Sequence, residues 1–218
     1  MINPFVDDFI KQGVFKTPAI IEAFKKIDRA DFVPPELKER AYINEPLPIG
    51  EGQTISQPYT VAFMVELLRP EAGNKIFEIG SGSGWQTAIL AHIVSRNGNQ
   101  KSKIKNQNLG KIYAVERIKA LYEFGARNIA KYNFIKKGIV ETIFGDATIG
   151  LKRHSPFDRI IAAAAGEAVP EAWLKELKTG GRLVAPVKNS IWLYIKKSEK
   201  EFDKKEYRGF VFVPLVKD

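Results

Sequence analysis

Between Asn74 and Val187 the sequence alternates strand patterns with helix patterns, and this alternation constrains the fold more than any other feature. Five apolar runs have the character of buried strands: 75–79, 111–116, 139–145, 157–165 and 181–187. Helical patterns lie between them at 85–95, 117–133 and 170–178. Strands connected in this way pair in parallel, because each helix carries the chain back across one face of the sheet. We therefore expect a parallel sheet with helices on both faces.

The flanking segments extend this prediction. Apolar runs at 191–197 and 207–216 predict two strands joined by a charged turn, which should add to one edge as an antiparallel pair. Upstream, Thr17 is a capping residue type followed by Pro18, a combination typical of a helix start. The expected fold is α/β: a Rossmann-like, doubly wound, mostly parallel sheet with antiparallel C-terminal edge strands and an N-terminal helical extension.

The composition excludes several kinds of chemistry. The 218 residues include no cysteine, so disulfides, thiolate nucleophiles and Cys-based metal sites are excluded. The only histidines, His92 and His154, lie far apart in the sequence, and we expect no metal site. The chain opens without a secretory signal and has no apolar run of membrane-spanning length. These features predict a cytoplasmic protein that does not contact a membrane.

A net charge of +9 leaves two interpretations of the surface. Such a charge can attract nucleic acid. The lysines are spread along the whole chain, however, which favours an ordinary lysine-rich surface and makes nucleic acid an unlikely partner. The segment 96–111 has five lysines or arginines and no acid, and we expect it to be a surface insertion.

A glycine-rich loop, FEIGSGSGW at 77–85, lies where the first predicted strand leads into a helix. Gly80, Gly82 and Gly84 permit a tight turn and the close approach of a ligand to the backbone. In parallel α/β sheets, ligands bind at the carboxyl ends of the strands. A dinucleotide fingerprint would need a small residue where Trp85 stands. The loop is thus either a structural turn or a cradle for another ligand.

Three acidic residues lie near the ends of consecutive predicted strands: Glu78, Glu116 and Asp146. An acid at the end of the second strand can accept hydrogen bonds from both ribose hydroxyls of a cofactor. Asp146 could reach an adenine amino group, with Ala147 close to the ring. Each acid alone could equally be a surface carboxylate. Their common position favours a nucleoside cofactor.

The order acid-x-Gly-x-Gly-x-Gly resembles the first motif of S-adenosylmethionine-dependent methyltransferases. With QTISQPY at 53–59 ahead of it, the chain closely resembles protein-L-isoaspartate O-methyltransferases over nearly its whole length. The resemblance also rests on these stretches: FVPPELKERAY, EPLPIGEGQTISQPYTVAFMVELL, IYAVERI, FDRIIAAAAGEAVPEAWLKELKTGGRLVAPV and FVPLV. TISQP is the most specific of them.

The resemblance implies methyl esterification of the free carboxylate of isoaspartyl residues in damaged proteins and peptides. The ester then collapses to a succinimide, and part of that reopens as normal aspartate. The implied cofactor is S-adenosylmethionine, with S-adenosylhomocysteine as product and no metal. Ser56 is implied as the active-site residue, with Gln53, Thr54 and Ile55 beside the substrate. The implied cofactor residues are Glu78, Gly80, Ser81, Gly82, Gly84, Glu116, Arg117, Asp146 and Ala147.

Physical chemistry agrees with this interpretation. The nucleophile would be a carboxylate, which is already ionised near pH 7 and needs no general base. Catalysis would be mostly positioning, with hydroxyls and backbone N–H groups holding an anion. Thr54 and Ser56 supply hydroxyls, and a helix that starts near Pro58 would add its N-terminal amides. Ser56 could instead simply cap that helix.

We expect one domain over 1–218: a helical substrate-side region at 1–73, a cofactor-binding α/β core at 74–187 and a C-terminal strand pair at 188–218. A monomer is expected. The chain departs from the family pattern at Gly166-Glu167, Ala147, 188–190 and 96–111. Alternatives are a methyltransferase acting on RNA or another carboxylate, and a ligand-binding protein without activity. Trp85 makes a nicotinamide oxidoreductase the weakest alternative.

Overall fold

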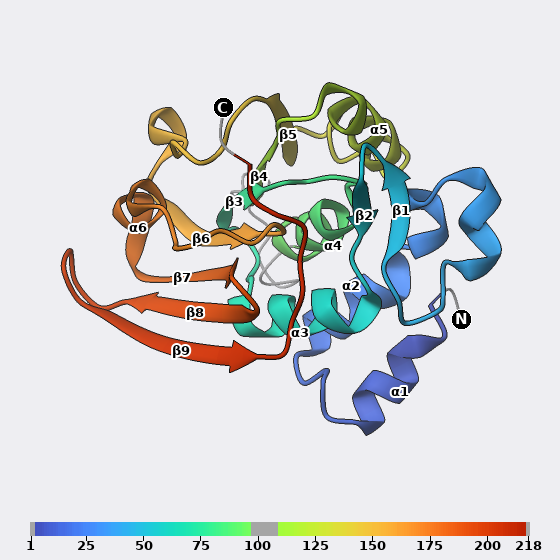
Figure 1. The fold of residues 1–218 in the computed structure, drawn as a ribbon, viewed down its shortest axis with the longest axis horizontal. Helices are drawn as coiled ribbons and strands as arrows, with labels where there is room; N and C mark the ends of the chain where they lie inside the picture. Colours follow the sequence, from blue (N-terminus) through green and yellow to red (C-terminus); the bar gives the residue numbers. More distant parts are fainter. Residues whose placement is uncertain (1–2, 97–108, 217–218) are drawn as a thin grey trace, which may run out of the picture.

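A seven-stranded sheet with the order β5-β4-β3-β6-β7-β8-β9 forms the centre of the computed structural model, which describes residues 3–96 and 109–216 (Figure 1). Its strands are β3 Lys75–Ile79, β4 Lys111–Glu116, β5 Val140–Phe144, β6 Phe157–Ala162, β7 Leu177–Val187, β8 Ser190–Lys196 and β9 Phe202–Arg208. Strands β3 to β7 pair in parallel, and β8 and β9 add antiparallel pairs at one edge. The predicted sheet type is confirmed. Most of the predicted insertion at 96–111 lies outside the described residues.

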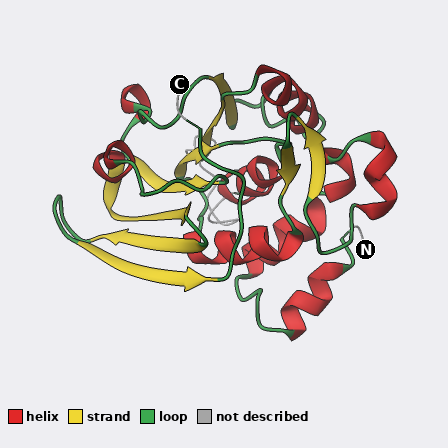
Figure 2. Ribbon diagram, viewed as in Figure 1, coloured by secondary structure: helices red, strands yellow, loops and turns green. Residues whose placement is uncertain are grey.

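Helices cover both faces of the sheet, but unequally (Figure 2). They are α1 Phe5–Lys11, α2 Pro18–Lys26, α3 Pro58–Leu68, α4 Trp85–Val94, α5 Lys119–Ala130 and α6 Glu171–Glu176, with 3-10 turns η1 Arg29–Phe32, η2 Pro35–Arg40 and η3 Lys152–His154. Alternation along β3 separates two cores. Ile76 joins the core with α1 to α5, whereas Phe77 joins the core with Trp173 of α6. None of the described helices is long and apolar enough to cross a bilayer.

The strand order determines where a site can form. From β3 the chain proceeds through α4, β4 and α5 to β5, and it then returns to place β6 on the other side of β3. The loops that follow β3 and β6 therefore diverge at the carboxyl edge of the sheet. Such a switch point is where doubly wound proteins bind their ligands.

The C-terminal prediction was partly wrong. The last strand, β9, occupies Phe202–Arg208 instead of 207–216, and it includes most of the charged stretch that we expected to be a turn. As an edge strand it tolerates its lysines, which blunt the exposed edge against pairing with other chains. The apolar residues 209–216 instead run back across the carboxyl ends of the strands (Figure 1, red). There Ala165 N–H donates to Val213 O at 2.9 Å, and Leu215 N–H donates to Ala165 O at 2.8 Å.

Two smaller differences concern the ends of helices. Thr17 is the N-cap of α2, as predicted, but its side chain makes no capping hydrogen bond and its hydroxyl donates to Glu66 Oε2 at 2.9 Å. Helix α6 ends at Glu176, and β7 starts at Leu177, four residues earlier than its predicted start. Pairing with β6 wins over helical propensity in this stretch.

Candidate active site

A cavity of about 340 Å³ lies at the carboxyl ends of the central strands. Nine of the residues that we predicted line it: Gln53, Thr54, Ser56, Gly80, Gly82, Glu116, Arg117, Asp146 and Ala147. Ile55, Glu78, Ser81 and Gly84 were also predicted and are not in its lining. Residues 211–216 cover one side, which we did not predict. The signal for that side was the apolar FVFVPLV run, which we assigned to a strand.

The glycine loop is held in shape by its neighbours. Gly80 and Ser81 donate their N–H groups to Val115 O at 2.9 and 3.2 Å. Gly82 has φ +50°, in the left-handed region where glycine is favoured. Gly125, in the middle of α5, packs against this loop so closely that a Cβ there would lie 2.5 Å from Gly82 O. The helix thus accepts a poor helix former because the loop needs the space.

Glu116 connects the loop to the second strand. It is buried, and its Oε2 accepts from Gly82 N–H at 2.9 Å while its Oε1 accepts from Ile118 N–H at 3.0 Å. Each carboxylate oxygen can accept a second hydrogen bond, and the residue faces the cavity. This arrangement fits a ligand that carries a diol, such as the ribose of a nucleoside cofactor.

Replacing Glu116 with alanine should weaken the binding of S-adenosylhomocysteine by about 1–3 kcal/mol, because ribose hydroxyls would then be buried without acceptors. Isothermal titration calorimetry measures this directly. Glu123→Ala, which removes an exposed carboxylate from α5, is the control. Equal affinities of the two variants would refute the placement of the ribose.

Glu78 lies one layer beneath the loop. Its side chain is fully buried, and Oε1 accepts from Gln86 Nε2 at 3.0 Å. Burial raises the pKa of the Glu78 carboxyl to about 7, and the charge of nearby Glu116 acts in the same direction. Glu78 therefore lies buried next to the glycine loop and does not itself line the cavity.

Asp146 and Ala147 form the rim beyond β5. Asp146 accepts from Thr148 N–H at 2.7 Å and from the Thr148 hydroxyl at 2.8 Å, which fixes its carboxylate. Ala147 O accepts from Trp173 Nε1–H at 2.8 Å, so α6 supports the same loop from below. Arg117 follows Glu116 directly and also lines the cavity. Asp146, Ala147 and Arg117 thus line one part of the cavity.

A hairpin that we did not predict supplies the opposite wall. It consists of β1 Leu47–Gly50 and β2 Gln53–Ile55. Glu51 and Gly52 turn the chain with φ values of +54° and +67°, as a tight hairpin turn requires. The Gly50-Glu51-Gly52 sequence was the available signal. Ser56 follows β2 and faces the cavity.

Ser56 does not occupy the cap position of α3. Gln57 is the N-cap residue, and its side chain makes no capping hydrogen bond. Instead Asn44, in the loop before β1, accepts from Tyr59 N–H at 2.9 Å. Pro58 has no N–H, so the first turn of α3 offers a ligand fewer amides than we expected. The interpretation of Ser56 as a simple cap is wrong, which leaves its hydroxyl available to a ligand.

Among the described residues, no group of three or more His, Cys, Asp or Glu side chains is positioned to hold an ion.

The strand order, the glycine loop and the acid on the second strand define a doubly wound α/β protein with a nucleoside-cofactor cavity. Residues 2–218 match the family described as protein-L-isoaspartate(D-aspartate) O-methyltransferase, and the chain belongs to this family.

Curated relatives and solved structures agree. The sequence is 41% identical to the protein-L-isoaspartate O-methyltransferase of Staphylothermus marinus over 97% of this chain and 92% of the relative. It is 38% identical to that of Methanopyrus kandleri over 94% and 86%. The fold matches a Plasmodium falciparum structure, solved with S-adenosyl-L-homocysteine and described as a putative member of this family, with a TM-score of 0.83, 23% identity and coverage of 98% and 97%. A further structure, titled protein-L-isoaspartate O-methyltransferase, matches with a TM-score of 0.82, 25% identity and coverage of 100% and 66%.

Proposed function

We propose that this chain methylates the free carboxylate of L-isoaspartyl residues in damaged proteins and peptides, using S-adenosylmethionine. The observation that carries the proposal is a single cavity that joins the Ser56 hairpin to the glycine loop and Glu116. A cofactor site alone would suit many methyltransferases. The hairpin with its hydroxyl residues gives the cavity a second half, suited to an anion. We include in the proposal a monomer, active in the cytoplasm without a metal.

The residues of this chain would divide the work between cofactor and substrate. Gly80 and Gly82 would lie against the amino-acid half of the cofactor, Glu116 would hold the ribose, and Asp146 with Ala147 would hold the adenine. When bound, S-adenosylmethionine supplies a methyl group on a positively charged sulfur.

On the substrate side, the hydroxyls of Thr54 and Ser56 would donate to the isoaspartyl carboxylate and orient one oxygen. These donors leave the carboxylate ionised and fix the position of the attacking oxygen. The apolar residues Val213 and Leu215 would limit the access of water from the opposite side. The chain's own contribution is therefore orientation and desolvation, with no proton transfer.

The test is methyl transfer from labelled S-adenosylmethionine to two peptides that differ only in aspartyl versus isoaspartyl linkage. We expect label on the isoaspartyl peptide alone, released as methanol in mild base because the product is a methyl ester. Label on neither peptide, with cofactor binding intact by calorimetry, would contradict the proposal.

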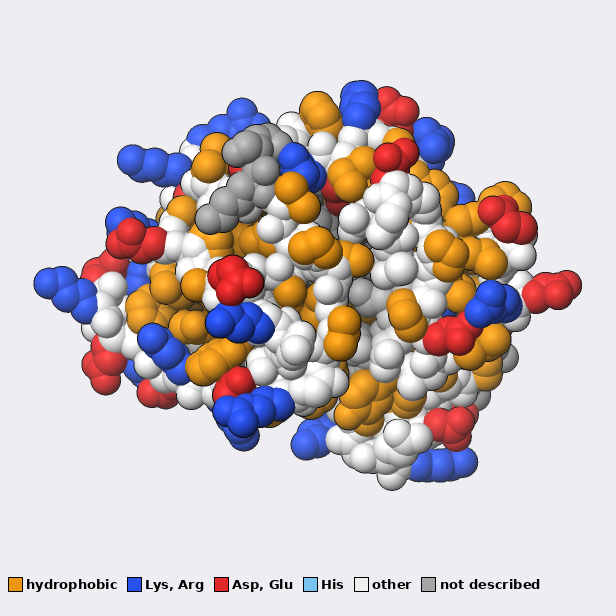
Figure 3. All heavy atoms as spheres, in the orientation of Figure 1, with side chains coloured by type: hydrophobic (Ala, Val, Ile, Leu, Met, Phe, Trp, Pro, Cys, Tyr) orange, Lys and Arg blue, Asp and Glu red, His pale blue; other side chains and the backbone are white. Residues whose placement is uncertain are grey.

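RNA is the competing substrate, suggested by the net charge of +9. The face seen in Figure 3 is largely apolar or uncharged over its centre, with charged side chains of both signs mostly nearer its edge. A continuous basic surface of the kind that nucleic acid binding uses is absent from this view. Labelled RNA in the same assay would reverse the assignment.

A further inference from the structure

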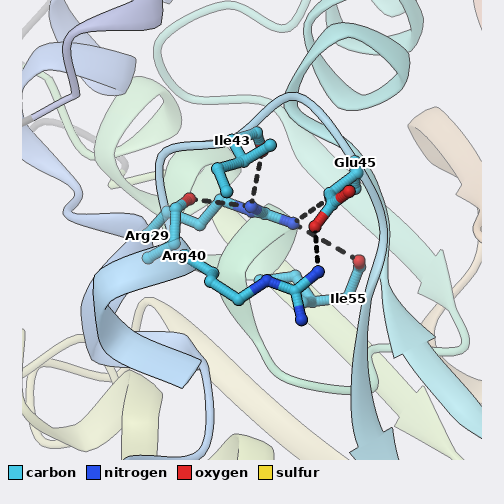
Figure 4. A network of polar contacts seen from close by, with 6 residues as sticks. Arg29, Arg40, Ile43, Glu45 and Ile55 are labelled. Atoms are coloured by element: carbon cyan, nitrogen blue, oxygen red, sulfur yellow. Dashed lines mark hydrogen bonds and ion pairs between the residues drawn. The ribbon is translucent and has the colours of Figure 1, made fainter. Parts of the chain in front are cut away.

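Arg29, the first residue of η1, is a fully buried arginine that does not line the cavity. Its guanidinium hydrogen bonds go to backbone carbonyls (Figure 4). The acceptors are Ala41 O at 2.7 Å, Ile43 O at 3.3 Å, Glu45 O at 3.0 Å, Ile55 O at 3.5 Å and Ser56 O at 3.1 Å. All of these bonds come from Nη1 and Nη2, and the buried Nε–H has no hydrogen-bond partner. The planar fork of two nitrogens spans carbonyls that the single nitrogen of an ammonium group would have to share.

These acceptors belong to the two segments that flank the β1–β2 hairpin, which the pairing of Leu47 with Ile55 already brings near each other. Three are in the loop that leads to β1, and two are at the end of β2, where Ser56 begins its approach to the cavity. The guanidinium carbon also lies 5.4 Å from the centre of the Trp85 ring. Trp85 is the first residue of α4 and directly follows the glycine loop. One side chain thus contacts the substrate-side hairpin, the loop before it and the helix of the cofactor loop.

The charge of Arg29 is balanced almost entirely by carbonyl dipoles. The Glu45 carboxylate lies near it but pairs with Arg40, so it contributes its field rather than a direct bond. Burying a cation is costly unless it is well hydrogen-bonded. A buried charge used only to fill space would be a poor choice, since an apolar side chain of similar volume often serves as well.

The backbone of Arg29 is itself fixed. Its N–H donates to Asn3 Oδ1 at 3.2 Å, and Asp28 caps the turn by accepting from Ala30 N–H at 3.0 Å. Asp28 N–H in turn donates to the Tyr132 oxygen at 3.0 Å, and the Tyr132 hydroxyl donates to Asp31 at 2.7 Å. The guanidinium is therefore supported by a rigid turn and can hold the Ser56 carbonyl in one place.

We propose that Arg29 is the positioning residue for Ser56. By donating to the Ser56 carbonyl from outside the cavity, it fixes the backbone there and keeps the Ser56 hydroxyl oriented toward the cavity. The inference rests on the proposed function of Ser56. It assigns Arg29 a part in the alignment of the substrate carboxylate and none in cofactor binding.

Arg29→Lys is the first test, because lysine keeps the charge but has one terminal nitrogen in place of the two that bind these carbonyls. We expect kcat for the isoaspartyl peptide to fall about 10-fold, and about 100-fold in Arg29→Met, since a displacement near 1 Å can cost that much. The affinity for S-adenosylhomocysteine should stay within about threefold by calorimetry. Phe5 and Phe24 still pack on Trp85 and hold α4.

A second readout does not depend on activity. Hydrogen–deuterium exchange at 53–57 should rise in Arg29→Lys while exchange along β4 is unchanged. This measurement tests the positioning of the Ser56 segment even if the peptide assay fails for the unaltered protein. Failure of the proposed function and failure of this inference are thereby distinguishable.

Lys196→Met is the matched control. Lys196 is also a buried cation bound to carbonyls, with Nζ donating to Leu177 O at 2.8 Å and to Leu174 O at 3.3 Å, and it does not line the cavity. We expect Lys196→Met to lower Tm without lowering kcat below its Tm. Losses of kcat that simply follow the loss of Tm in both variants would overturn the inference, as would unchanged kcat and exchange in Arg29→Lys.

If Arg29→Lys does not bind cofactor, Tyr132→Phe replaces it. This variant keeps the guanidinium and removes the hydroxyl that steadies η1 through Asp28 and Asp31. Raised exchange at 53–57 with intact cofactor binding supports the inference, and unchanged exchange there overturns it.

Discussion

Ser56→Ala is expected to lower kcat for an isoaspartyl peptide by about 10²-fold, because the substrate carboxylate would lose a donor that orients it and a misplacement near 1 Å can cost that much. Ser56 lines the cavity, and the Asn44 side chain accepts from an N–H group in the first turn of the helix that follows. The substitution therefore removes a ligand contact without removing a cap. Steady-state kinetics with separate titrations of peptide and cofactor measure the effect.

The affinity of Ser56→Ala for S-adenosylhomocysteine should not change, because the residue is assigned to the substrate side. Ser190→Ala serves as control, since that hydroxyl is buried away from the cavity and donates to Glu206 in β9 at 2.8 Å. Full turnover in Ser56→Ala would remove the serine from the mechanism. A parallel loss in both variants would point to a general loss of stability.

Glu78→Gln is expected to stabilise the protein at pH 8 by about 3 kcal/mol and to do little at pH 4. The native pKa of about 7 lies above the value of 4.5 for an unperturbed glutamate. The difference corresponds to roughly 1.4 kcal/mol per pH unit between those two values. Burial is the main cause, with Thr87 and Gln86 opposing it by favouring the ionised form.

The sign follows from proton binding. Between pH 4.5 and pH 7 the native state holds the Glu78 proton more tightly than the unfolded chain does. The stabilising contribution of this carboxyl is thus complete below about pH 4.5 and is lost as the pH rises through about 7. Glutamine stays neutral at every pH and can keep accepting from Gln86 through its carbonyl.

Urea unfolding of both proteins at intervals from pH 4 to pH 8 gives the comparison. The difference in free energy of unfolding should grow with pH, and Glu171→Gln controls for the loss of one exposed carboxylate. Parallel pH curves for wild type and Glu78→Gln would show that the buried carboxyl does not titrate in this range.

The parallel core was predictable because local patterns determine it. KIFEI and KIYAVE give β3 and β4 with the expected bounds, since buried strands are nearly continuous apolar runs. The glycine loop and Glu116 were likewise predictable, because strand ends in such a sheet meet at one edge. The role of Gly125 could not be predicted from its own helix, where glycine is unfavourable. Its reason is the close contact with the glycine loop, which lies some 40 residues earlier in the sequence.

The missed features depend on contacts between distant segments. Asn44 caps a helix that starts fourteen residues later, and Arg29 binds carbonyls as far away as Ser56. Neither partner is visible in a local pattern. The β9 error has a different cause: a charged edge strand resembles a turn in sequence, and the apolar run after it resembles a strand although it serves as a cavity wall.

The crossing of residues 209–216 over the sheet also sets an order of assembly. Two walls of the cavity come from distant parts of the sequence, the hairpin from residues 47–55 and the other wall from 211–216. During synthesis the hairpin and the parallel core leave the ribosome first, and the site is still open on one side until the final segment emerges. A chain that is stalled before that point would contain the parallel sheet but would lack the segment that lines one side of the cavity.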